Sequence, residues 1–200
     1  MMYNRQDAFY KKAKREGYRS RAAYKLIELN KKYEIYRNGH NVLDVGCAPG
    51  GWTQVVLQMS KTRVVGVDLL ETGDMEMERF KFILGDITTQ ETVDEVLAAC
   101  SGYDAVISDA APNTSGSKLL DHVNSIELVR KIFYFACSVL KPHGNFICKV
   151  FEGEDRDALV KEMKVHFDFC KHIRPEATRK GSFEMYIILK GFKGLPKNEQ

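Results

Sequence analysis

Short apolar runs alternate with longer amphipathic stretches along most of the chain. The apolar runs are rich in Val, Ile and Phe and predict buried β-strands. We place these strands at residues 42–45, 63–68, 80–86, 103–109, 145–151, 167–173 and 183–192. The amphipathic stretches repeat their apolar positions every three or four residues. They predict helices at residues 7–16, 20–33, 51–60, 88–100, 121–140 and 154–167, the second of them capped by Ser20.

The order of these elements predicts the fold class. Strands and helices alternate until the last two strands, which follow each other without a helix between them. This order is typical of an α/β fold with a doubly wound, mostly parallel seven-stranded sheet and an antiparallel last strand. We expect a single domain over residues 1–200, with a helical extension at 1–37, a core at 38–192 and a tail at 193–200.

Charge is distributed unevenly along the chain. The whole sequence has a formal net charge of +3, but residues 1–37 contain eleven Lys or Arg and four Asp or Glu. Their net charge is +7, which leaves −4 for the rest. Such a basic extension is a plausible phosphate-binding surface. The alternative is an ordinary amphipathic helix with a solvated basic face.

Several classes of protein are disfavoured by the composition. No run reaches the roughly 20 apolar residues that a membrane span needs, and the first residues do not resemble a signal peptide. The five cysteines form no CxxC pair, and the histidines have no ligand-like spacing. We therefore expect a soluble cytoplasmic protein with reduced thiols and no metal site, and, without a coiled-coil seam, a monomer.

The stretch NVLDVGCAPGGW, residues 41–52, joins the first strand to the next helix through a loop of small residues. Gly46, Gly50 and Gly51 allow the backbone to approach a ligand closely, and Pro49 stiffens the turn. In open α/β sheets, ligands bind at the carboxyl end of such a strand. The spacing G-x-x-x-G-G differs from the G-x-G-x-x-G of dinucleotide sites, and no GK[ST] follows. A nucleotide-like ligand other than a dinucleotide or ATP is favoured.

Three acidic residues end the strands that follow the glycine loop. Asp68, Asp86 and Asp109 each stand at the predicted carboxyl tip of a strand. Asp68 lies about 20 residues beyond the glycine loop, where α/β nucleotide-binding proteins place a carboxylate for ribose hydroxyls. One such acid is often a helix cap or a turn former. Three in succession favour a shared site.

Two lysines are candidates for chemistry. Lys149 interrupts an apolar run that should be buried, and a buried lysine is costly unless it is paired or used. We interpret Lys149 as functional. Lys25 lies beside the apolar stripe of the second helix, so it either reaches the ligand crevice or extends along the surface into solvent.

The motifs together resemble the FtsJ/RrmJ family of RNA 2′-O-methyltransferases over essentially the whole chain. In order they are SRAAYKL, LDVGCAPGGW, VVGVDL, GDI, SDAAPN, SG, CKVF and SFEMY. The resemblance implies the methyltransferase fold, S-adenosylmethionine as methyl donor, and S-adenosylhomocysteine as product. It also implies a catalytic tetrad of Lys25, Asp109, Lys149 and Glu184. The implied cofactor contacts are Gly50, Trp52, Asp68, Asp86 and Asp109.

The implied reaction gives these residues roles. A ribose 2′-hydroxyl must be held in line with the donor methyl group, and Lys149 is the candidate to accept its proton or to orient it. Asp68 would bind the cofactor ribose and Asp86 the adenine amino group. Trp52 either walls the methionine end or packs its helix onto the sheet. Candidate contacts to RNA phosphates are Arg19, Arg21, Lys31, Lys32, Arg179 and Lys180.

The expected acceptor is a uridine of 23S-type large-subunit ribosomal RNA, because the compact length resembles that subgroup. A tRNA anticodon loop or an mRNA cap are alternative acceptors for the same chemistry. A noncatalytic RNA-binding ribosome-assembly factor is a second class, although such a factor needs no buried Lys149. A nucleotide-dependent oxidoreductase is disfavoured by the glycine spacing.

Overall fold

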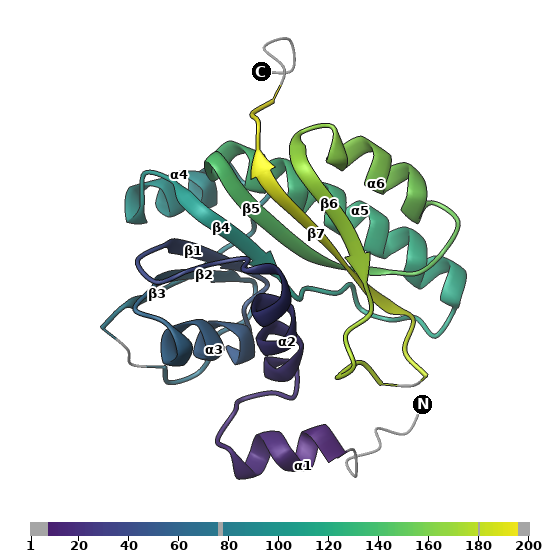
Figure 1. Cartoon of the computed structure of the whole chain (residues 1–200), viewed down its shortest axis with the longest axis horizontal. Helices are drawn as coiled ribbons and strands as arrows, with labels where there is room; N and C mark the ends of the chain where they lie inside the picture. The colour runs from purple at the N-terminus through teal and green to yellow at the C-terminus, as the bar shows by residue number, and fades with distance from the viewer. Residues whose placement is uncertain (1–7, 76–77, 180, 196–200) are drawn as a thin grey trace.

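A single seven-stranded sheet forms the centre of the molecule (Figure 1). The structure is a computed structural model that describes residues 8–75, 78–179 and 181–195. The strand order is β3-β2-β1-β4-β5-β7-β6, and β7 runs antiparallel to both of its neighbours while the other pairings are parallel. The predicted fold class is confirmed. The strands are β1 Asn41–Val45, β2 Arg63–Asp68, β3 Phe80–Leu84, β4 Tyr103–Ser108, β5 Leu140–Phe151, β6 Phe167–Ile173 and β7 Glu184–Phe192.

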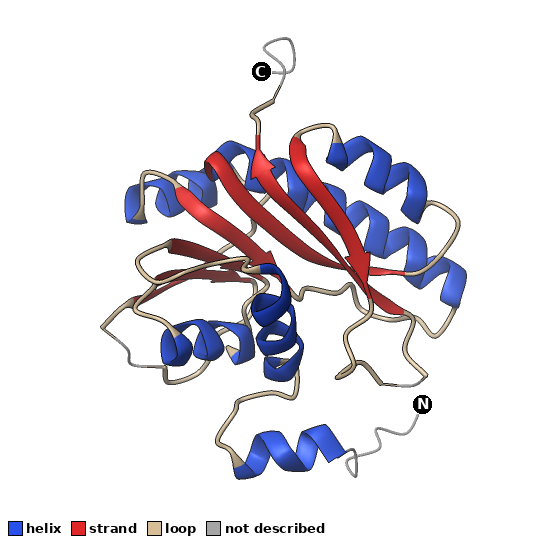
Figure 2. Ribbon diagram, viewed as in Figure 1, coloured by secondary structure: helices blue, strands red, loops and turns tan. Residues whose placement is uncertain are grey.

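Helices cover both faces of the sheet (Figure 2). Apolar side chains of α2 and α3 pack on one face, and those of α4, α5 and α6 pack on the other. The helix α1 lies outside these two layers, against α2 and the loop between β6 and β7. None of the helices in the described ranges is long and apolar enough to cross a membrane. The helices are α1 Ala8–Arg15, α2 Ala23–Tyr33, α3 Gly51–Met59, α4 Gln90–Ala99, α5 Lys118–Val139 and α6 Arg156–Lys164.

Several predicted helix boundaries are wrong, α6 for example ending at Lys164 and not at Phe167, and the starts of α2 and α5 have a local cause. The helix α2 begins at Ala23 with Ala22 as its N-cap and no side-chain cap, because Ser20 lies in a turn packed against Gly51 of α3. The helix α5 begins three residues earlier than predicted, because the side chain of Ser117 accepts a hydrogen bond from the amide of Leu120. These two starts depend on tertiary packing and on a side-chain cap, respectively.

The core on the α5 side centres on Phe133. Its side chain is fully buried, and its ring lies 6.0 Å from that of Phe146 and 6.4 Å from that of Phe167, measured between centroids. These contacts join α5 to β5 and β6. Aromatic pairs at such separations stabilise a core beyond the burial of their area alone.

The first strand carries a buried carboxyl group, Asp44, that also fixes α3. Asp44 is 1% exposed, and the hydroxyl of Thr53 donates a hydrogen bond of 2.6 Å to its Oδ2. Burial raises the pKa of Asp44 to about 7; the bond from Thr53 opposes this shift, and the carboxylates of Asp109 and Asp68 add to it. The bond holds the start of α3 against β1, directly beyond the glycine loop.

Replacing Phe133 should destabilise the protein strongly. We expect Phe133→Ala to lower the free energy of unfolding by about 3–5 kcal/mol, because the lost ring leaves a cavity that the sheet closes only in part. Leu119→Ala is the matched control, since Leu119 lies on the same helix but is 74% exposed. Urea denaturation measures both. Equal losses for the two variants would contradict this description of the core.

Asp44 should make the protein less stable as the pH rises from about 4 to about 7. In that window the folded protein retains a proton that the unfolded chain has released, so stability falls by at most about 1.4 kcal/mol per pH unit. The variant Asp44→Asn cannot titrate. We therefore expect its free energy of unfolding, relative to that of the wild type, to increase from pH 5 to pH 7.5 in urea denaturation. A constant difference would contradict the raised pKa.

Candidate active site

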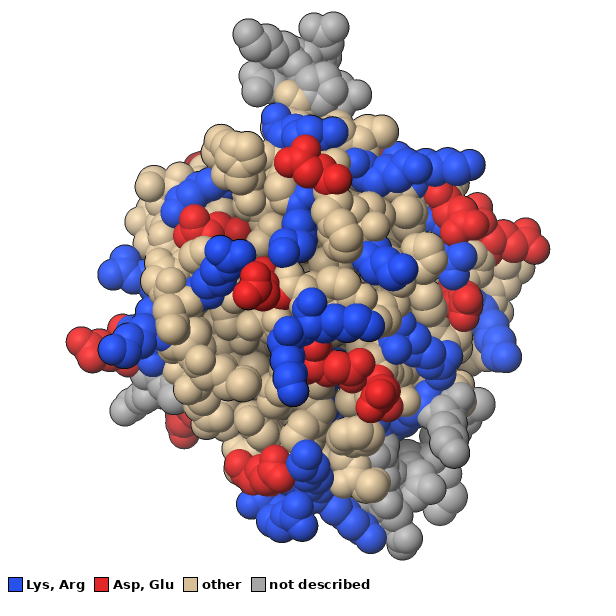
Figure 3. Space-filling view, in the orientation of Figure 1, with Lys and Arg blue, Asp and Glu red and all other residues tan. Residues whose placement is uncertain are grey.

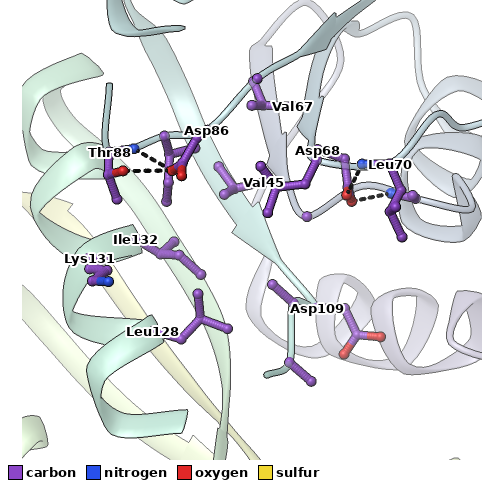
Figure 4. A pocket seen from close by; sticks show the side chains of 17 residues that line it. Val45, Val67, Asp68, Leu70, Asp86, Thr88, Asp109, Leu128, Lys131 and Ile132 are labelled. Atoms are coloured by element: carbon purple, nitrogen blue, oxygen red, sulfur yellow. Dashed lines mark hydrogen bonds between the residues drawn. The ribbon is translucent and has the colours of Figure 1, made fainter. Parts of the chain in front are cut away.

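A cavity of about 460 Å³ opens at the carboxyl ends of the first four strands (Figure 4). Its volume falls in the range of about 300–1,000 Å³ that is typical of small-molecule sites. The three acids predicted to share a site, Asp68, Asp86 and Asp109, all line it. The remaining wall is largely apolar and comes from the glycine loop, the segment after β2, and α5, including Gly46, Ala48, Leu69, Leu70, Leu128 and Ile132.

The carboxylate of Asp68 is fixed by backbone amides on both oxygens. Oδ2 accepts a hydrogen bond of 2.8 Å from the amide of Ala48 in the glycine loop, and Oδ1 accepts one of 2.9 Å from the amide of Leu70. The glycine loop is also tied to β2, because the amide of Gly46 donates to the carbonyl of Val67. Strand β2 thus holds the loop and its own terminal acid in one arrangement.

Asp86 lies in the turn after β3, two residues beyond the strand's end. Its Oδ1 accepts hydrogen bonds from the amide and the hydroxyl of Thr88, at 2.9 Å and 2.8 Å. These two bonds lower the pKa of Asp86 below its usual range. The carboxylate is therefore ionised at neutral pH and oriented at the cavity wall, where it can accept hydrogen bonds from a ligand (Figure 4).

Gly50 and Trp52, predicted as cofactor contacts, lie behind the cavity wall and are absent from its described lining. Gly50 has a φ of +94°, and a Cβ there would meet the Cε of Met75 at 2.2 Å. Trp52 is 3% exposed, and its ring nitrogen donates a hydrogen bond of 2.9 Å to the carbonyl of Ala22. Trp52 therefore packs α3 against α2. Direct contact of either residue with a cofactor stays a prediction.

The four residues of the predicted tetrad come together from α2, β5, β7 and the end of β4. The Nζ of Lys149 lies 3.2 Å from Oδ1 of Asp109 and donates a hydrogen bond of 2.6 Å to its backbone carbonyl. The Nζ of Lys25 lies 2.8 Å from Oε2 of Glu184. The Nζ of Lys25 also lies 3.9 Å from Oδ1 of Asp109, and the Nζ of Lys149 lies 3.9 Å from Oε1 of Glu184. Two buried lysines thus alternate with two carboxylates.

Tyr186 is a fifth member of this cluster that the sequence reasoning missed. Its hydroxyl accepts a hydrogen bond of 2.9 Å from Lys25 and donates one to Oδ1 of Asp109. Burial, followed by the charges of Asp109 and Glu184, raises the pKa of Tyr186 well above its usual value, so the hydroxyl keeps its proton. Glu184 and Tyr186 are two residues apart on one strand and share a face. That spacing could have identified Tyr186 from the sequence, because Glu184 was already a predicted member of the site.

Asp109 belongs to both the cavity and the lysine cluster. Burial opposes its ionisation, but Lys149 and then Lys25 outweigh it, so the pKa of Asp109 lies below its usual range. The carboxylate is ionised and shared by two lysine side chains at the cavity's edge. A group bound in the cavity beside Asp109 would therefore lie next to Lys149. Among the described residues, no group of three or more His, Cys, Asp or Glu is placed to hold a metal ion.

The predicted phosphate contacts that the structure describes come from the turn before α2, the end of α2 and the loop after β6. The guanidinium of Arg19 donates to three backbone carbonyls, and that of Arg21 donates to the carbonyl of Ala177. Lys31 and Lys32 lie in the last turn of α2, at the opposite end of that helix from Lys25. Lys180 lies outside the described residues. The basic side chains of α1 belong to the extension predicted to bind phosphates, and they gather at one end of the molecule (Figure 3): Lys11, Lys12, Lys14 and Arg15.

Comparison with known proteins gives consistent matches. Residues 18–192 match the family model described as FtsJ-like methyltransferase. The chain is 47% identical to a protein of Archaeoglobus fulgidus named ribosomal RNA large subunit methyltransferase E, over 97% of this chain and 100% of that one. A Hyphomonas neptunium protein of the same name is 44% identical, over 94% of this chain and 80% of its own.

A solved structure agrees with these matches. It belongs to a Plasmodium falciparum protein described as a ribosomal RNA methyltransferase, with a TM-score of 0.80 and 31% identity. The alignment covers 89% of this chain and 100% of that one. The family match spans the cavity, both lysines and Glu184. The family resemblance seen in the motifs is confirmed, and the chain belongs to the FtsJ-like methyltransferase family.

Proposed function

We propose that this protein transfers a methyl group from S-adenosylmethionine to a ribose 2′-hydroxyl of RNA in the large ribosomal subunit. The observation that carries the proposal is the position of Asp109, whose carboxylate joins the cavity to the cluster of two buried lysines. A methyl donor in the cavity and a hydroxyl at Lys149 would then be neighbours. Much of the rate of such a transfer can come from holding the two reactants in line.

The cavity residues fit S-adenosylmethionine, which supplies a methyl group on a positively charged sulfur. Asp68 would accept hydrogen bonds from ribose hydroxyls, and Asp86 would accept one from the adenine amino group. Both carboxylates are fixed by backbone or side-chain donors before any ligand binds. The apolar wall of Leu128 and Ile132 suits the flat face of a base.

Lys149 is the proposed contact to the 2′-hydroxyl. Its Nζ has three positions for hydrogen bonds, and two of them point to the carbonyl and the carboxylate of Asp109. The third remains for the substrate oxygen. As an ammonium, Lys149 would orient the hydroxyl; as an amine, it would accept the proton that the hydroxyl loses. The same geometry serves both roles.

Lys25, Glu184 and Tyr186 support this arrangement. Lys25 is held by Glu184 and by the hydroxyl of Tyr186, which in turn donates to Asp109. Because all of these groups are bonded to one another, each fixes the rotamer of the next. We propose that they keep Asp109 and Lys149 in the productive geometry, and that Lys25 also contacts the ribose or its phosphate.

The basic extension is the proposed contact to RNA phosphates. Helix α1 presents Lys11 and Lys14 to solvent. Its Ala13 packs against Ala177 and against Tyr24, the residue that precedes Lys25. A cationic helix at this place would position RNA without reading its sequence.

We propose that the protein acts in the cytoplasm. We also propose that it is a monomer, because one chain supplies all the described residues of the site.

Ribosomal RNA is favoured over other acceptors by the relatives. The proteins of Archaeoglobus fulgidus and Hyphomonas neptunium are both named for the large ribosomal subunit RNA. We propose a uridine of the large-subunit RNA as the acceptor. A tRNA anticodon loop is the second candidate, since the chemistry is the same. A noncatalytic assembly factor is disfavoured, because binding alone gives no reason to bury Lys25 and Lys149 at 6% and 7% exposure.

Lys149→Ala should abolish turnover and keep cofactor binding. We expect the rate of methyl transfer from labelled S-adenosylmethionine to large ribosomal subunits to fall at least about a hundredfold, the usual loss for a group that handles the substrate proton. Lys141→Ala is the matched control, because Lys141 lies at the other end of the same strand in a salt bridge with Asp104. Its rate should stay within about twofold.

Calorimetric titration with S-adenosylmethionine accompanies the rate measurement. Full turnover of Lys149→Ala with normal cofactor affinity would refute the role of Lys149. Transfer by the wild type to bulk tRNA and not to large subunits would favour the second acceptor. If no RNA is labelled by the wild type, the protein is not an RNA methyltransferase.

Removing charge from α1 should weaken RNA binding in a salt-dependent way. We expect the double variant Lys11→Ala, Lys14→Ala to bind RNA less tightly and to reduce the slope of log affinity against log salt by about one to two, because fewer counterions are released. The pair Lys161→Ala, Lys164→Ala on α6 is the matched control, with the same spacing and exposure. An unchanged slope in the α1 variant, measured by filter binding, would exclude α1 from the RNA surface.

A further inference from the structure

The guanidinium of Arg19 is engaged by the protein itself. Its Nε donates a hydrogen bond of 2.6 Å to the carbonyl of Pro49, and its Nη1 donates one of 2.9 Å to the carbonyl of Asp74. Its Nη2 donates to the carbonyl of Thr72. All three nitrogens of the fork are therefore directed at backbone oxygens. An arginine that binds a phosphate would instead direct these donors toward solvent and the ligand.

The three acceptors lie in two segments that build the cofactor cavity. Pro49 follows Ala48, which lines the cavity and whose amide binds Asp68. Thr72 and Asp74 belong to the segment that continues from Asp68, Leu69 and Leu70, which also line the cavity. Arg19 does not itself line the cavity in the described structure. Arg19 therefore connects the glycine loop to the segment after β2 on the side away from the cavity.

The backbone of Arg19 is anchored as firmly as its side chain. The side chain of Gln54 in α3 accepts a hydrogen bond of 2.8 Å from the amide of Arg19 and donates one of 2.8 Å to the carbonyl of Gly17. Gly50 packs so closely here that a Cβ would lie 3.3 Å from Cδ of Arg19. The backbone at Arg19 is thus fixed to α3, and its side chain lies against the glycine loop.

We propose that Arg19 is a positioning residue for S-adenosylmethionine. It holds the glycine loop and the segment 72–74 at the separation that forms the cavity, and it acts on the cofactor rather than on RNA phosphates. The guanidinium spreads its donors over three nitrogens and so reaches three separated carbonyls, whereas all the donors of a lysine lie on one atom. The inference rests on the proposed function, because it assumes that the cavity binds S-adenosylmethionine.

Two variants of the full chain test this role. We expect Arg19→Gln to raise the Kd for S-adenosylmethionine about tenfold, since charged hydrogen bonds of this kind are lost. At saturating cofactor its kcat should stay within about twofold, and its RNA affinity and salt slope should not change. Arg19→Lys keeps the charge but loses the fork, so we expect it to raise the Kd as well. Calorimetry and steady-state kinetics give these values.

The matched control is Arg79→Gln. Arg79 also donates to three backbone carbonyls, those of Leu57, Ser60 and Thr62, but at the far end of α3 from the cavity. The Arg79→Gln variant should leave the cofactor Kd unchanged. It therefore separates an effect on the cavity from an effect on the stability of the whole protein. The melting temperature of every variant is measured as well. If the Arg19 variants lower thermal stability no more than Arg79→Gln does, an increased Kd is due to the cavity.

The outcomes distinguish this inference from the proposed function. Wild-type affinity for S-adenosylmethionine in both Arg19 variants would overturn the inference and leave the proposed function intact. A loss of RNA affinity in Arg19→Gln that Arg19→Lys restores, at constant cofactor Kd, would make Arg19 a phosphate contact instead. A wild-type protein that does not bind S-adenosylmethionine would refute the proposed function, and the inference with it.

Discussion

The pairing of Asp109 with two buried lysines is the interaction on which the site depends. Burying Lys25 and Lys149 without partners would be costly, so their burial requires the carboxylates of Asp109 and Glu184. Asp109 is in turn kept ionised by the same lysines, although burial opposes its charge. Removing any one member leaves an uncompensated charge beside the cavity. The cluster therefore persists only as a whole, which suits a site that must hold a substrate oxygen in one place.

The topology of the sheet explains how these groups meet. Parallel strands place their carboxyl ends at one edge, so Asp68, Asp86 and Asp109 arrive there from three strands. The antiparallel strand β7 instead begins at that edge, and its first residues pair with the last residues of β5. Lys149 lies opposite Tyr186 in this register, and Glu184 lies opposite Phe151. The insertion of β7 between β5 and β6 thus delivers the last carboxylate to the lysines.

Much of this arrangement could be predicted from the sequence, because it depends on patterns that are local. Apolar runs located the strands, and an acid at the end of each run placed Asp68 and Asp109 at the ligand edge. The conformation of the turn at residues 17–22 could not be predicted in this way. It is fixed by Gln54 and Trp52, which reach it from α3, and by the side chain of Arg19, which reaches the glycine loop. Ser20 therefore does not cap α2, and Arg19 faces carbonyls. Tyr186 was hidden because an aromatic residue in an apolar strand also suits the core.

The central claim is that the methyl group goes to a ribose oxygen held at Lys149. The most direct measurement is to find which atom carries the methyl group after large ribosomal subunits are labelled by the protein, using mass spectrometry of the nucleosides together with alkaline hydrolysis. A 2′-O-methyl group removes the hydroxyl that alkaline cleavage needs, so we expect one methylated ribose and an uncleaved linkage beside it. A methyl group on a base, with normal cleavage at that position, would contradict it.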